Sequence, residues 1–123
     1  ISSCISKNIN NRSITMDIQV YFDEDNEKIN LYHEERDYRF GVIVVSNQKK
    51  YMVNIYGITR LNQEFQEACL NGEVFYIEPN LIIVSNVDKN SIIKSIVGIG
   101  KEYNFLSQLK EVDVDLSKYV RVY

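Results

Sequence analysis

The chain has 123 residues, of which 45% are hydrophobic and 25% are charged, and its formal net charge is -3. These values are typical of one globular domain that buries a core without disulfide or metal staples, and they argue against disorder. A membrane-spanning helix is excluded because no apolar run approaches the roughly 18 residues that it needs. The overall basic field that collects nucleic acid is also missing.

The first 15 residues are rich in Ser and Asn and predict a disordered leader or an upstream remnant. Patterned sequence begins at Met16, so we expect a single domain over residues 16–123. An alternative comes from ISSC at residues 1–4, which is similar to the end of a bacterial lipoprotein signal, where small residues precede a lipid-modified Cys. In that alternative the chain is a lipid-anchored surface or periplasmic structural subunit tethered through Cys4.

Strand patterns come first in the domain. Residues 16–22 and 29–34 alternate apolar and polar side chains, the period of half-buried strands, and residues 23–26 form a polar turn between them. We therefore expect a first hairpin. The β-rich runs at residues 38–46 and 51–56, joined by a polar loop of four residues, predict a second hairpin.

Helical spacing then appears, because Leu61, Phe65, Ala68 and Cys69 share one stripe of a helix. Thr59 is the expected N-cap and Gly72 the expected stop, and the stripe predicts that Cys69 is a buried, inert thiol.

Short strands are expected at residues 74–77 and 81–84, on either side of Pro79. A second helix begins at Asp88 or Asn90, a further helical turn covers residues 105–109, and residues 112–116 add a last strand or lie over a sheet edge. The order of these elements predicts an α+β fold, a mainly antiparallel β-sheet covered on one face by two α-helices.

Catalytic and metal-binding patterns are weak. His33 is the only histidine, and in an extended strand it would point the same way as Glu35 and Asp37, which is the basis for a metal site or a small enzyme. A nucleophilic Cys69 would need His33 to approach through the fold. The glycines at residues 98–101 lack the spacing of phosphate-binding loops. We therefore predict no enzyme, no cofactor and no metal.

Charge placement is the most informative feature. Residues 17–39 hold eight acids and three bases, a local charge of -5 that exceeds the -3 of the whole chain. Such a run is typical of a solvated loop, but it also favours docking to a basic partner, and tyrosines nearby supply contact area with a hydrogen-bonding tip. The predicted partner-binding residues are Asp23, Glu24, Asp25, Tyr32, Glu34, Glu35, Asp37 and Tyr38.

The segments MDIQVYFDEDNEKINLYHEERDYRFGVIVVS, YMVNIYGITRLNQEF and FYIEPNLIIVSNV carry a resemblance. Residues 16–109 resemble, in size, α+β style and acidic balance, the small bacterial immunity proteins of contact-dependent growth inhibition and related toxin systems. The resemblance implies a cytoplasmic protein that binds one cognate toxin, often a nuclease, and blocks its active site or substrate groove. Together with the acidic run, it leads us to expect a basic toxin domain as the partner. The acids near the tyrosines argue against binding to nucleic acid, and we expect no membrane contact unless Cys4 is lipidated. Those proteins share no universal motif, so the resemblance assigns no role to any single residue.

Overall fold

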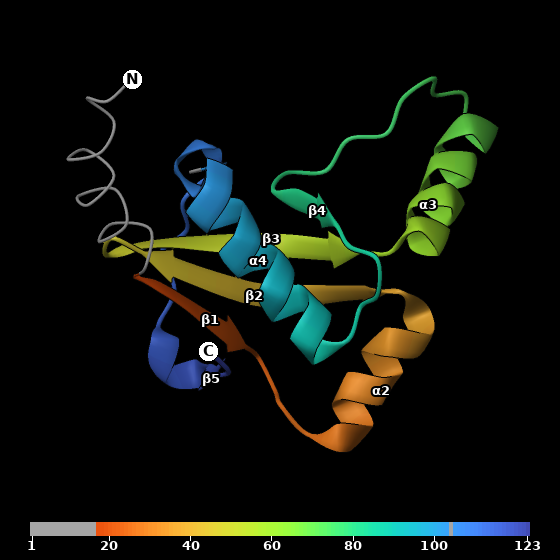
Figure 1. Cartoon of the computed structure of the whole chain (residues 1–123). Helices are drawn as coiled ribbons and strands as arrows, with labels where there is room; N and C mark the ends of the chain where they lie inside the picture. The colour runs from red at the N-terminus through yellow and green to blue at the C-terminus, as the bar shows by residue number, and fades with distance from the viewer. Residues whose placement is uncertain (1–16, 104) are drawn as a thin grey trace.

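The computed structural model describes residues 17–103 and 105–123, and the predicted leader with its Cys4 lies outside them. Within these ranges a five-stranded mixed sheet is combined with three α-helices (Figure 1), which confirms the predicted α+β class. The strands are β1 Ile18–Phe22, β2 Tyr38–Ser46, β3 Lys49–Tyr56, β4 Leu81–Ile83 and β5 Val120–Arg121. The helices are α2 Glu27–Arg36, α3 Ile58–Leu70 and α4 Lys89–Tyr103, with short 3-10 helices at η1 Phe105–Gln108 and η2 Leu116–Lys118.

The sheet has the strand order β4-β3-β2-β1-β5. All neighbouring strands are antiparallel except β3 and β4, which run parallel. The predicted hairpin of β2 and β3 is confirmed, but its turn is shorter than expected. Asn47 and Gln48 alone form it with φ values of 52° and 67°, the left-handed pair that a tight two-residue hairpin requires.

The predicted first hairpin is wrong, because residues 29–34 belong to helix α2. Asn26 begins this helix by accepting a hydrogen bond from the Ile29 backbone N–H at 2.9 Å, and Glu27 in the first turn and Arg36 in the last complement the helix dipole. In so short a segment the apolar positions fit two periods. Ile29 and His33 are four residues apart, a spacing that places two side chains on the same face of a strand and also on the same face of a helix.

Helix ends were predicted with more success than the remaining strands. Gly72, with φ 91°, follows the end of α3 as expected, and Asp88 caps α4 by accepting from the Ser91 backbone N–H at 2.7 Å. The expected N-cap Thr59 is wrong, since α3 already begins at Ile58 after Gly57. Residues 74–77 form no strand.

In the tail, the expected helical turn is confirmed, but the strand considered for residues 112–116 is not formed. The expected helical turn is present as η1. Residues 112–115 are not a strand, although Val112 donates a backbone hydrogen bond to Lys50 at 2.9 Å beside β3. The last strand, β5, comes later and pairs with β1 at the opposite edge of the sheet.

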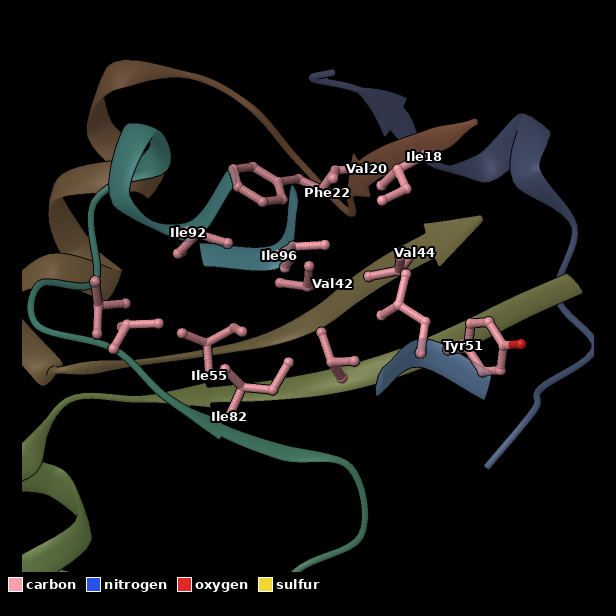
Figure 2. Close-up of a cluster of buried hydrophobic side chains, with 14 residues drawn as sticks. Ile18, Val20, Phe22, Val42, Val44, Tyr51, Ile55, Ile82, Ile92 and Ile96 are labelled. Atoms are coloured by element: carbon pink, nitrogen blue, oxygen red, sulfur yellow. The ribbon is translucent and has the colours of Figure 1, made fainter. Parts of the chain in front are cut away.

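The core lies between one face of the sheet and α4 (Figure 2). Ile92 and Ile96 of α4 are fully buried against side chains such as Val20, Phe22 and Val42. Among the described residues neither α2 nor α3 has a buried one. Both helices lie at the same end of the sheet, where β1 and β3 end and β2 begins (Figure 1).

Candidate partner-binding surface

Five of the eight predicted site residues lie together on one exposed region. Asp23 and Glu24 are exposed in the loop before α2, and Tyr32, Glu34 and Glu35 are exposed on α2 itself. The carboxylates of Glu24, Glu34 and Glu35 are open to water and to a partner, whereas that of Asp23 accepts from the Glu24 backbone N–H at 2.9 Å and lies 4.0 Å from the Arg39 guanidinium. The structure therefore keeps the acidic character of this segment on its surface, although the segment is a helix and not a hairpin.

Asp25 is engaged within the molecule instead. Its carboxylate accepts from Lys89 Nζ at 2.6 Å and from the Asn30 side-chain amide at 2.9 Å. The hydrogen bonds from Asn30 and Lys89 hold the pKa of Asp25 below its usual value. The ion pair joins the start of α4 to the loop before α2, and the Asn30 hydrogen bond joins that loop to α2. The main contribution of Asp25 is therefore to position α2.

Asp37 also has a structural role. It follows α2 in the left-handed conformation, with φ 59°, and its Oδ2 accepts from the Arg60 backbone N–H at 3.1 Å. Gly57 at the start of α3 provides no side-chain cap of its own. The Asp37 carboxylate therefore satisfies an N–H group in the first turn of α3 that a local cap would ordinarily satisfy.

Tyr38 lies in a row of aromatic rings that runs from α2 across the end of the sheet. Its ring centroid is 6.4 Å from that of His33, 4.6 Å from that of Phe40 and 6.4 Å from that of Tyr56. The guanidinium of Arg60 lies 4.1 Å from the Tyr38 ring centroid. Only part of the Tyr38 side chain therefore remains open to a partner.

The row continues through Tyr56 to Tyr76, in the segment after α3. Their hydroxyl groups are 2.8 Å apart, and each donates to Glu78 Oε1 at 2.7 Å. Burial, followed by these hydrogen bonds, raises the pKa of Tyr56. The network holds residues 76–78 against the end of β3.

Arg39 is the residue of this region that sequence reasoning missed. It is only 1% exposed, its guanidinium lies 3.8 Å from the Phe22 ring centroid, and it donates to Asn30 Oδ1 at 2.7 Å and to the Glu24 carbonyl. It thus connects the acidic loop and α2 to the core. An arginine is rarely so buried. The only feature of the sequence that indicated its burial was its place inside the β-rich run of residues 38–46.

The helical form of α2 changes the proposed metal constellation. Glu35 lies half a helical turn away from the side that His33 and Asp37 share, and the carboxylate of Asp37 is engaged at α3. No group of three His, Cys, Asp or Glu residues that could hold a metal occurs in the part of the chain that the structure describes.

Cys69 was predicted to be a buried, inert thiol. That prediction is wrong, because the thiol is exposed on α3.

A second acidic stretch belongs to the same end of the molecule. Residues 61–88 contain five acids and no base, and they include most of α3 and the segment that follows it. Residues 40–60 and 89–123 together contain nine bases and four acids. We call α2 with the loop before it, α3 and residues 71–80 the acidic end. This second acidic stretch could be recognised in the sequence, because no Lys or Arg lies between Arg60 and Lys89.

The comparisons with known proteins add no assignment. Searches against protein-family models, curated proteins and solved structures find no match for this chain. In the described ranges, every helix is too short or too polar to cross a membrane.

Proposed function

We propose that this protein is a non-enzymatic immunity protein, which binds a cognate basic toxin domain through the acidic end and neutralises it. The observation that carries the proposal is the separation of charge along the chain. Residues 17–39 and 61–88 each carry a charge of -5, whereas residues 40–60 and 89–123 together carry +5. The acidic end contains ten of those thirteen acids, and its helices α2 and α3 lie at one end of the sheet (Figure 1).

Inhibition follows from the chemistry of such a surface. A nuclease needs a basic groove to hold the phosphate backbone. The exposed carboxylates of Glu24, Glu34 and Glu35 are attracted to the same groove, and the surface that carries them occludes it. Complementary charge accelerates the encounter and disfavours acidic partners. The proposed site of action is the cytoplasm, where a nuclease toxin finds its substrate.

Apolar contact area accompanies the charge. Leu31 and Tyr32 of α2 are about half exposed, and the guanidinium of Arg36 lies 3.8 Å from the Tyr32 ring centroid. Aromatic and arginine side chains of this kind supply much of the binding free energy at protein interfaces. We therefore place the centre of the α2 contact at Tyr32 and its acidic rim at Glu34 and Glu35.

The experiment compares three immobilised forms of the full chain as baits in an extract of its native host. They are the wild type, the variant Glu34→Lys/Glu35→Lys, and the control Lys101→Glu/Lys118→Glu, which changes exposed bases outside the acidic end. The proposal expects one stoichiometric basic protein on the wild type and on the control, lost from the α2 variant and after a high-salt wash.

Neutralisation is then tested by producing the captured protein in cells with and without this chain. The proposal expects growth arrest by the captured protein alone and relief of that arrest by the wild-type chain. Relief that is equally strong with the α2 variant would remove α2 from the site. A captured protein that is harmless, or whose toxicity the chain does not relieve, would contradict the immunity function.

A further inference from the structure

A groove between α3 and the segment that follows it is separate from the α2 surface. It encloses about 340 Å³. We call it the α3 groove and define it by six of its lining residues, Glu64, Glu67, Ala68, Glu73, Phe75 and Ile77. Three of these six are carboxylates, and the other three provide apolar wall.

The apolar side chains around the α3 groove are unusually open to water. Phe75 is 56% exposed, Ile77 is 80% exposed and Val74 is 86% exposed. Three further apolar side chains of α3, those of Ile58, Phe65 and Leu70, are exposed as well. Large apolar side chains concentrated in one region of a soluble protein are typical of an interaction surface.

The negative charge around the α3 groove indicates which kind of side chain binds there. The carboxylates of Glu64, Glu67 and Glu73 line it. Glu64 is already paired with the Arg60 guanidinium at 3.0 Å, whereas Glu67 and Glu73 form no ion pair in the part of the chain that the structure describes. A lysine or arginine matches both features, because its aliphatic stem packs on apolar wall while its charged head reaches a carboxylate.

A second copy of this chain is a poor occupant by the same reasoning. Two α3 grooves facing each other would bring Glu67 and Glu73 of one copy against the same two carboxylates of the other, and like charges across an interface disfavour association. The groove therefore favours a different protein that offers apolar and basic side chains together.

The walls of the α3 groove are held in place from two sides. Tyr76 and Glu78 join the outer segment to Tyr56 at the end of β3 through hydrogen bonds of 2.7–2.8 Å. On the other side, Asp37 caps the first turn of α3. A groove formed before binding avoids the entropy cost of ordering its walls.

We propose that the α3 groove binds a basic amphipathic segment of a partner protein, with Phe75 and Ile77 contacting its apolar side chains and Glu67 and Glu73 contacting its Lys or Arg. The inference rests on the proposed function only in that the toxin domain is the expected source of this segment. The two proposals fail separately, because the groove is tested with a probe that requires no toxin.

The probe is a fluorescent helical peptide built only from Leu and Lys, with its leucines on one face. Its anisotropy is titrated with the full chain, and two matched peptides serve as controls, one with every Lys replaced by Glu and one with the leucines dispersed around the helix. We expect the Leu/Lys peptide to bind at least about tenfold more tightly than either control.

Protein variants then assign the site. We expect Phe75→Ser/Ile77→Ser to weaken binding at least about tenfold, and Glu67→Gln/Glu73→Gln to weaken it in a way that disappears at high salt. Val120→Ser, which removes a 44%-exposed apolar side chain from β5, is the control and should leave the affinity within twofold of wild type. Leu31→Ser tests whether the peptide binds at α2 instead. Circular dichroism verifies that each variant is folded.

Several results would overturn the inference. The proposal fails if the Leu/Lys peptide does not bind, if the Glu peptide binds equally well, or if Leu31→Ser weakens binding as much as the groove variant does. It also fails if sedimentation velocity shows a dimer of this chain that the peptide displaces, because a second copy would then occupy the groove. A groove that binds the peptide while the captured protein proves harmless would support this inference and contradict the immunity function alone.

Discussion

The carboxylate of Asp37, one residue beyond α2, accepts a hydrogen bond of 3.1 Å from the backbone N–H of Arg60 in the first turn of α3. One side chain thereby links the two helices of the acidic end. The backbones meet at the same place, where the Gly57 N–H donates to the Asp37 carbonyl at 2.9 Å. Asp37 was expected to contact a partner directly, and the structure assigns it to the support of the surface instead.

Replacing Asp37 with Ala is expected to lower the free energy of unfolding by about 1 kcal/mol, because a helix N–H loses its cap. The backbone of Asp37 is also in the left-handed conformation, with φ 59°, which Asn tolerates better than Ala. Asp37→Asn keeps an acceptor oxygen and should lose less stability. Urea denaturation of the two variants measures the difference, and equal stability of Asp37→Ala and wild type would exclude the capping role.

Gly57→Ala is expected to destabilise the protein by about 1–3 kcal/mol, because a Cβ at this position would collide with the Asp37 carboxylate. The test is a double-mutant cycle with Asp37→Gly, which removes the colliding side chain. The cost of Gly57→Ala should fall in the Asp37→Gly background. An unchanged cost would show that the glycine is needed for another reason.

Arg39→Lys is expected to be costly although it keeps the charge. A lysine cannot reproduce the planar donors that reach Asn30 and the Glu24 carbonyl, and these partly buried acceptors would lose their donor. The expected loss is on the order of 3 kcal/mol, measured by thermal or urea unfolding. The matched control Arg36→Lys, at an exposed residue of α2, should change stability by less than about 0.5 kcal/mol.

Stability is expected to fall as the pH drops below about 6.5, the usual pKa of histidine. Burial, with a further contribution from Arg39, lowers the pKa of His33 in the folded protein. The unfolded chain therefore takes up a proton at a higher pH than the folded one, and protonation favours unfolding. The dependence of stability on pH therefore begins near the pKa of His33 in the unfolded chain and ends below its pKa in the folded protein.

Urea midpoints of the wild type and His33→Gln across this range provide the measurement. The variant should lose the part of the pH dependence that lies just below the usual histidine value. Its carboxylates should still give the loss of stability at more acidic pH, because Asp25 has a pKa lowered by Asn30 and Lys89. Identical profiles for the two proteins would show that His33 does not titrate differently on unfolding.

Those features that depend on local chemistry were predictable from the sequence. The β-rich runs around Asn47 gave the hairpin of β2 and β3, and Asp88 and Gly72 marked helix ends through their own side-chain and backbone properties. Helix α2 was missed because a six-residue alternation satisfies the helical period too. The Asn26 cap and the good helix formers after it were the stronger signal.

Features that depend on distant partners were not predictable. Whether the carboxylate of Asp25 faces water depends on Lys89, which is 64 residues away in the sequence. The stripe that contains Phe65 correctly indicated a helix, but a stripe does not tell whether another element covers it. In the candidate site, the exposed acids of α2 were therefore anticipated, whereas the buried Arg39 and the open α3 groove were not.

The most direct test of the acidic end is the association rate constant of the full chain with the captured basic protein, measured by stopped flow or surface plasmon resonance at low and high salt. At low salt we expect Glu34→Lys/Glu35→Lys to slow association by about tenfold or more, the difference to shrink at high salt, and Lys101→Glu/Lys118→Glu to associate no more slowly than wild type. Equal rate constants for the wild type and the α2 variant at low salt would contradict the account.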